Sequence, residues 1–171
     1  MTSTGNQWSL SIEGANFIRR MEGERAIVYL DAGGLPTAGV GHLLSKVEAR
    51  RYAVGTLVPS VKINSWFAVD CTTASSGAQR LFYTGRVLQA WQLQQATFDA
   101  LCSFVFNLGE GAIRGGAKTM TAWGRGDIDR FCRSMTKWNN VMGADGLLTP
   151  NKGLAWRRAA EVSLIRDGKY S

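Results

Sequence analysis

The segment FIRRMEGERAIVYLDAGGLPTAGVGHLL, residues 17–44, carries the clearest structural signals in the chain. Its first residues continue a helix that Ser11 can cap, because a hydroxyl accepts hydrogen bonds from the free N–H groups of a first helical turn. Gly23 suits the C-terminal end of that helix. Residues 26–30 are apolar and partly β-branched, and residues 37–41 can return as a second short strand after an Asp-Ala-Gly-Gly turn. The segment therefore predicts a helix followed by a β-hairpin.

The rest of the chain indicates helices. Apolar periodicity and helix-end signals predict them at residues 61–72, 97–108, 117–123, 127–138 and 149–166. Thr97 and Thr149 are the expected N-caps of two of these helices. Residues 73–77, rich in Ser and Thr, are expected to form a loop or a helix break, and residues 111–116 a glycine-rich turn. The pattern predicts an α+β fold that is mostly helical.

The composition is typical of one folded domain. The chain has 171 residues and a mean hydropathy of −0.10, and no stretch approaches the roughly 20 apolar residues of a membrane-spanning helix. Residues 1–10 contain neither a basic flank nor a continuous apolar segment, so we expect no signal peptide and no signal anchor. Cys71, Cys102 and Cys132 form no CxxC pair, and the chain has a single histidine. These counts favour small buried thiols, and we expect neither a metal nor a cofactor.

Positive charge is concentrated in the second half of the chain. Residues 114–171 contain 11 Lys and Arg against 5 Asp and Glu, a balance of +6 out of the total of +7. A basic half predicts a polyanionic partner, and nucleic acid, anionic lipid and bacterial cell wall all qualify.

Two carboxylates in the first segment have the arrangement that glycosidic bond cleavage needs. Glu22 ends the apolar stripe of the first helix, and Asp31 begins the hairpin turn nine residues later. One acid can protonate the leaving oxygen while the other carboxylate positions water or stabilises the sugar cation. Thr37, on the returning strand, offers a hydroxyl that can hold the attacking water. Spacing alone fits two surface acids equally well.

The motifs of this segment resemble those of the phage-type lysozymes, glycoside hydrolase family 24. The shared pattern is Glu-Gly, an Asp nine residues after the Glu, a Thr six residues after the Asp, and then Gly-x-Gly-His, which stand here as Glu22-Gly23, Asp31, Thr37 and Gly39-Val40-Gly41-His42. Residues 98–109 resemble the central helix of the family. A weaker match joins Trp138-Asn139 to Gly153-Leu154 and Arg157-Arg158-x-x-Glu161. Residues 46–91 match poorly.

The resemblance implies a lysozyme-like α+β fold with a small N-terminal lobe, which holds a short antiparallel sheet, and a larger C-terminal helical lobe. Residues 1–171 would form a single catalytic domain, with lobes at approximately residues 12–70 and 71–171, the first helix packing on the C-terminal lobe and the active-site cleft between the lobes. The implied reaction is hydrolysis of the β-1,4 bond between N-acetylmuramic acid and N-acetylglucosamine in peptidoglycan.

The resemblance also implies residue roles. Glu22 would be the general acid, while Asp31 and Thr37 would position water for an inverting attack. Leu43 and Phe106 match positions that line the saccharide cleft. Three further residues would support the site: His42 paired with Asp70, and Arg157, or else Lys152, reaching toward Glu22.

Other functions stay open on sequence grounds. A lytic transglycosylase works with one essential acid, so the presence of Asp31 and Thr37 argues against it. A catalytically idle basic module for an envelope or nucleic acid is the alternative outside the enzymes. For the leading interpretation, an endolysin, we expect a monomer that binds peptidoglycan, without nucleic acid and without stable membrane insertion. It would stay in the host cytoplasm until a holin releases it to the periplasm and cell wall.

Overall fold

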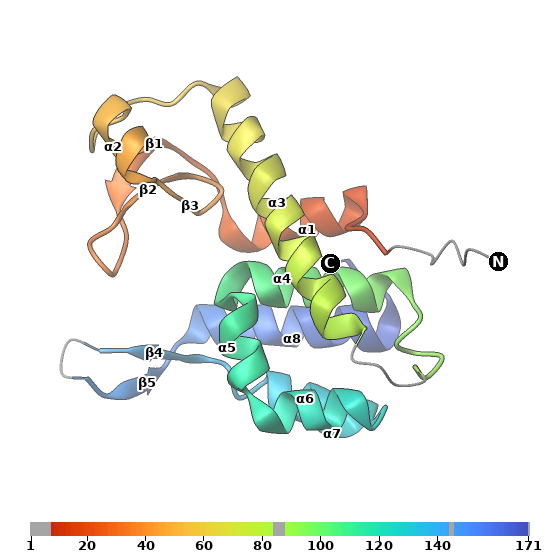
Figure 1. Ribbon diagram of the computed structural model, residues 1–171. Helices are drawn as coiled ribbons and strands as arrows, with labels where there is room; N and C mark the ends of the chain where they lie inside the picture. Colours follow the sequence, from red (N-terminus) through yellow and green to blue (C-terminus); the bar gives the residue numbers. More distant parts are fainter. Residues whose placement is uncertain (1–7, 84–87, 144–145, 171) are drawn as a thin grey trace.

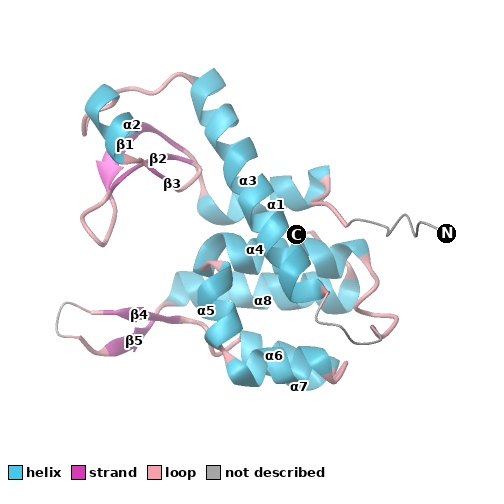
Figure 2. Cartoon of the chain, in the orientation of Figure 1, coloured by secondary structure: helices cyan, strands magenta, loops and turns pink. Residues whose placement is uncertain are grey.

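The N-terminal helix and hairpin have the predicted order. The computed structural model describes residues 8–83, 88–143 and 146–170 (Figures 1 and 2). Helix α1 covers Ile12–Glu22; the Ser11 hydroxyl accepts a 2.9 Å hydrogen bond from the Gly14 N–H, and Gly23 ends the helix at a φ of 69°. Both predicted ends of this helix are therefore confirmed.

A three-stranded antiparallel sheet follows α1. Strands β1 (Arg25–Leu30), β2 (Pro36–Gly39) and β3 (His42–Leu43) lie in the order β1-β2-β3. The predicted second strand, residues 37–41, is shorter than expected, and the third strand was not predicted. Gly39 and Gly41 both have positive φ, 62° and 69°, so the chain turns between β2 and β3 where a continuous strand was expected.

A long helix connects the sheet to the helical part of the molecule. After the short helix α2 (Lys46–Arg51), helix α3 covers Ser60–Phe82 without a break (Figure 1). The predicted loop at residues 73–77 is therefore wrong. The hydroxyls of Thr72 and Thr73 donate to the carbonyls four residues before them, and the small buried residues that follow allow helix α4 to approach closely.

The C-terminal part contains five helices among the described residues: α4 (Gln95–Leu108), α5 (Glu110–Gly115), α6 (Ala117–Gly124), α7 (Ile128–Met135) and α8 (Lys152–Asp167). The strands β4 (Asn140–Met142) and β5 (Leu148–Pro150) form a hairpin before α8. Helix α4 is the centre of this part, since α1, α3 and α8 all pack against it.

Several predicted helix limits are wrong, each for a local reason. Helix α4 begins at Gln95, because the Thr97 hydroxyl donates to the Trp91 carbonyl instead of capping the helix. The expected turn at residues 111–116 is mostly helix α5, which buries Ile113. The predicted 127–138 helix ends at Met135.

The start of the last helix also differs from the prediction. Thr149 and Pro150 belong to strand β5, and Asn151 caps α8 by accepting a 2.9 Å hydrogen bond from the Leu154 N–H. An asparagine side chain caps as well as a threonine does, and Pro150 fits an edge position because it has no N–H to donate.

The largest aromatic cluster fills the space between α3, α4, α6 and α7. Phe82, Phe98, Trp123 and Phe131 are fully or almost fully buried, and their rings contact one another or Trp91 at centroid distances between 5.2 and 5.9 Å. Cys71, Cys102 and Cys132 are buried free thiols, as predicted. Within the described residues, no helix is both long and apolar enough to cross a membrane.

Candidate active site

Glu22 is the last residue of α1, and its side chain is mostly buried between α8 and the sheet. Arg157 Nη1 donates a hydrogen bond to its Oε1. The other carboxylate oxygen, Oε2, faces the backbone of Gly41, where a Cβ atom would lie only 3.2 Å away. The structure therefore holds the carboxylate from one side and places it against the turn between β2 and β3.

Arg157 is itself fixed by a buried ionic cluster on α8 and α4. Its Nε donates to Glu161 Oε1 at 3.1 Å, and its Nη2 donates to the carbonyl of Ser103 at 3.0 Å. Arg158 Nε lies 3.0 Å from Glu161 Oε2, at an angle that is poor for a hydrogen bond, and its Nη2 donates to Asn107. These contacts prevent Arg157 from swinging away from Glu22.

Burial sets the electrostatics of this cluster. Burial raises the pKa of the Glu161 carboxyl above its usual range, although the two neighbouring arginines oppose the shift. Burial also lowers the pKa of Arg158 to about 10, against the opposing charge of Glu161. Two arginines thus surround one buried carboxylate, and Arg157 also donates to Glu22.

Asp31 stands at the start of the hairpin turn and uses one of its oxygens to build that turn. Oδ1 accepts hydrogen bonds from the N–H groups of Gly33 at 2.9 Å and Leu35 at 2.8 Å. Among the described residues, Oδ2 has no hydrogen-bond partner. The turn thus fixes the carboxylate and leaves one oxygen available to a ligand.

Thr37 lies on β2, the central strand, and is buried. It is opposite Tyr29 of β1 and Leu43 of β3. Its hydroxyl donates to the carbonyl of Leu35 at 3.1 Å. Because its proton is used in this way, the oxygen can only accept from a further partner.

Leu43 and Phe106, the two predicted saccharide contacts, line the same cavity of about 360 Å³ between the sheet, α3 and α4. Leu43 is 52% exposed, so its side chain is available to a ligand. The prediction did not include Arg80 and Glu110, which lie at the same cavity and form an ion pair with a 2.8 Å hydrogen bond. The Arg80 and Arg114 guanidinium groups lower the pKa of Glu110 to about 2.

His42 contacts Asp70, as expected from the resemblance. Its Nδ1 lies 2.8 Å from Asp70 Oδ2, and its ring stacks on Trp66 with centroids 4.6 Å apart. Burial lowers the pKa of His42, but Asp70 and Glu48 raise it by more, so it lies above its usual value. Glu48 and Trp66 were missed, although Ser45-x-x-Glu48 is readable as a capping box, and α2 has one.

The structure brings some of the predicted site residues together: His42, Leu43, Asp70 and Phe106 line one cavity, whereas Glu22, Asp31 and Thr37 are not among its lining residues. Glu22 faces Gly41, which is followed by His42 and Leu43 of β3, and β3 pairs with Thr37 of β2. Arg157, and not Lys152, reaches Glu22. In the described part of the chain, no group of three or more His, Cys, Asp and Glu side chains is placed to hold a metal ion.

Comparison with known proteins identifies a matching family and similar proteins. The sequence profile of the phage lysozyme family matches residues 19–161. The endolysin of Salmonella phage P22 is 35% identical over 106 residues, which cover 62% of this chain and 67% of that protein. The endolysin of Acyrthosiphon pisum secondary endosymbiont phage 1 is 27% identical over 158 residues, covering 92% and 98% of the two chains. The solved endolysin from Escherichia coli O157:H7 phage FAHEc1 shares the fold, with a TM-score of 0.80 at 23% identity over 95% of this chain and 96% of that one.

Proposed function

The chain belongs to the phage lysozyme family, glycoside hydrolases that degrade bacterial peptidoglycan, and we propose that Glu22, Asp31 and Thr37 carry out its reaction. The bond cleaved is the β-1,4 linkage between N-acetylmuramic acid and N-acetylglucosamine. The observation that supports this proposal most directly is the position of Glu22, held by Arg157 on one oxygen while the other faces the sheet that carries Thr37.

Glu22 acts as the general acid in this proposal. Because Arg157 fixes Oε1, Oε2 is the oxygen that can give its proton to the leaving sugar oxygen. The bond between the anomeric carbon and that oxygen then breaks, and the leaving sugar departs as a neutral alcohol.

Asp31 and Thr37 position the attacking water. Asp31 Oδ2 and the Thr37 oxygen are both acceptors, so a water between them would donate both of its protons to the protein. Its lone pairs would then point toward the anomeric carbon, on the side opposite the leaving group, which gives inversion. The proton that the water loses passes to Asp31, and the net reaction consumes one water molecule.

The remaining predicted residues have supporting roles. We propose that Leu43 and Phe106 bind the saccharide, because both line the cavity beside the sheet. Arg157 would hold Glu22, while His42 and Asp70 would fix the short β3 strand to α3. Residues 1–171 would act as a single catalytic domain, with lobes at approximately residues 12–70 and 71–171.

The cellular role follows from the same proposal. Both curated relatives bear the name endolysin, and we propose that this chain acts as a monomer that stays in the host cytoplasm until a holin gives it access to the wall. Expression with and without a holin gene tests this role: lysis should require the holin, and lysis without it would contradict holin dependence.

A lysis assay with product analysis tests the reaction. The enzyme should clear a suspension of chloroform-treated Gram-negative cells and produce fragments with reducing N-acetylmuramic acid ends. Fragments with anhydro sugar ends would instead identify a lytic transglycosylase. A folded chain that binds the wall without any clearing would identify an idle binding module.

A further inference from the structure

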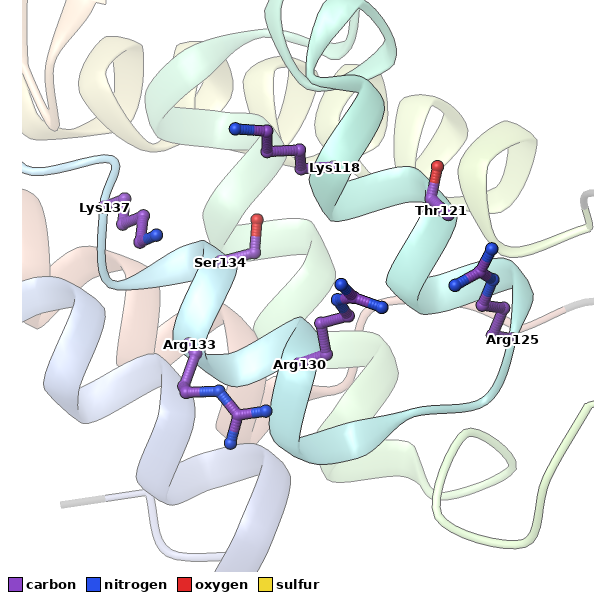
Figure 3. Close-up of a pocket in the computed structure, with 7 residues that line it drawn as sticks. All are labelled: Lys118, Thr121, Arg125, Arg130, Arg133, Ser134 and Lys137. Carbon is purple, nitrogen blue, oxygen red and sulfur yellow. The ribbon is translucent and has the colours of Figure 1, made fainter.

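A second hollow lies between α6 and α7, apart from the cavity beside the sheet (Figure 3). Its volume is about 690 Å³, and none of its lining residues belongs to the other cavity. Among the described residues, five cationic and two hydroxyl side chains line it: Lys118, Thr121, Arg125, Arg130, Arg133, Ser134 and Lys137. Five like charges around one hollow repel one another, so an anionic ligand would be bound favourably.

The carboxylates closest in sequence are engaged elsewhere. Asp127 caps α7 by accepting a 2.9 Å hydrogen bond from the Arg130 N–H, and Asp129 accepts from Arg166 of α8 at 2.6 Å. Within the described residues, no ion pair joins any of the five cations to a carboxylate. Arg166 and, less strongly, Arg133 lower the pKa of Asp129, so one carboxylate lies near the Arg133 side of the hollow.

The arrangement of the cations indicates the shape of the ligand. Figure 3 shows Lys118 and Thr121 on α6, Arg125 after its end, and Arg130 and Ser134 on α7. Lys118, Arg125 and Arg130 lie around a hollow formed by two short helices, whereas the Arg133 side chain points toward α8. These charges gather in one place and do not follow an extended stripe. A duplex nucleic acid needs cations spread along its backbone, whereas this arrangement suits a compact ligand with clustered negative charges.

We propose that this hollow is a second, non-catalytic binding site for a compact sugar headgroup that carries at least two phosphate groups. Arg125 and Arg130 supply planar guanidinium groups that can bind phosphate oxygens in pairs, and the two lysines add point charges. Phosphorylated sugars of this kind occur in lipid headgroups of bacterial outer membranes and as free metabolites.

A role in holding the enzyme on the envelope rests on the proposed function. An enzyme that binds an insoluble polymer through its cleft would gain residence time from a second contact on another face. The site itself does not depend on turnover, so its test uses the Glu22→Gln chain, in which catalysis is removed. Failure of the binding test and failure of the lysis assay can therefore be distinguished.

A pair of matched double variants tests the site. Lys118→Gln/Arg130→Gln removes one lysine and one arginine from the hollow, and Lys46→Gln/Arg50→Gln removes the same two charges from exposed positions on α2. Calorimetric titration uses fructose 1,6-bisphosphate as the probe, with neutral fructose as its control. Flotation uses phosphatidylcholine vesicles with and without lipid A, which presents two phosphates on a sugar headgroup.

The proposal expects saturable binding of the bisphosphate, no binding of fructose, and weakening by about tenfold or more in the hollow variant only. If the protein floats with lipid A vesicles and the bisphosphate releases it from them, the ligand is a lipid headgroup. If the protein binds the bisphosphate but does not float with these vesicles, the ligand is a free phosphorylated sugar. Equal weakening by both double variants would overturn the site, since it would indicate general charge attraction. Absence of saturable bisphosphate binding would overturn the site as well. So would a short DNA duplex that binds more tightly than the bisphosphate and whose binding is weakened by the hollow variant.

Discussion

Glu22 can be tested by a change that keeps its shape and its contact with Arg157. Glu22→Gln retains an oxygen that can accept from Arg157 but has no carboxyl proton to donate. We expect the rate of lysis to fall by a factor on the order of 10² or more, measured as the clearing of chloroform-treated cells. Glu24→Gln, at an exposed ion pair with Arg19, is the control and should lyse at the normal rate. Normal lysis by a folded Glu22→Gln chain would contradict the proposed mechanism.

A substitution at Thr37 can distinguish a catalytic role of its hydroxyl from a purely structural role in the strand. Thr37→Val keeps the β-branched shape and removes the hydroxyl, whose hydrogen bond to Leu35 contributes roughly 1 kcal/mol to stability. If the oxygen holds the attacking water, kcat should fall by a factor on the order of 10², with the thermal midpoint lowered by only a few degrees. Steady-state kinetics beside a thermal melt make the comparison. An unchanged kcat would remove Thr37 from the site.

At the scale of elements, the contact between β3 and α3 should make stability depend on pH. The pKa of His42 is raised above its usual value, mainly because Asp70 and Glu48 outweigh its burial. The stability that this contact adds is therefore complete below the unfolded pKa of about 6.5 and is lost as pH rises through the folded value. Asp70→Asn should lower the melting temperature by roughly 3 °C or more near pH 5.

The same substitution should have a smaller effect on the melting temperature at alkaline pH, because the His42 proton is lost as pH rises through its raised folded pKa. Thermal melts of the two chains across this range make the test. A difference that stays constant from acid to alkaline pH would show that the charge of His42 does not contribute to the contact.

Helix α3 depends on small residues where it crosses α4. A Cβ atom at Gly77 would lie 2.9 Å from Val105 Cγ1 and 3.4 Å from Glu110 Cβ. Gly77→Leu should therefore destabilise the fold by about 1–3 kcal/mol, because overpacking exceeds the gain in helix propensity. Urea denaturation measures the change, with Ser76→Leu at the neighbouring half-buried position as the control. A stabilised Gly77→Leu chain would show that the two helices can separate without cost.

At the scale of the whole molecule, the sequence predicted the features that depend on interactions between neighbouring residues. The ends of α1 were predictable because Ser11 and Gly23 act on adjacent backbone groups. The helical state of residues 73–77 was not predictable, because small buried residues in this stretch stabilise the helix by packing against α4. The third strand was missed for the same kind of reason, since two residues become a strand only when β2 lies beside them.

The candidate site was also predictable only in part. The spacing of Glu22, Asp31 and Thr37 was visible in the sequence, although their meaning depended on the family resemblance. The ion pair of Arg80 with Glu110 joins residues 30 positions apart on two helices, and no sequence pattern announces it. Lys152 and Arg157 could not be distinguished until the start of α8 was known, because that start determines which face of the helix meets Glu22.

The buried cluster on α8 connects stability to the candidate site and allows a last prediction. Glu161 is fully buried and compensates the charges of both Arg157 and Arg158. Glu161→Gln removes the carboxylate partner of Arg158 and leaves Arg157 paired only with Glu22 among the described residues. The fold should therefore lose about 3–5 kcal/mol, which corresponds to a drop in melting temperature of roughly 10 °C.

Activity should report the same change independently, because Arg157 loses one of the contacts that fix it beside Glu22. At a temperature where the variant is still folded, we expect kcat to fall while KM changes little, since the saccharide contacts at Leu43 and Phe106 remain. The matched control is Asp129→Asn, which breaks an exposed pair with Arg166 and should leave both the melting temperature and kcat near their original values. A Glu161→Gln chain with normal stability and normal kcat would show that the cluster neither holds α8 in place nor positions Glu22.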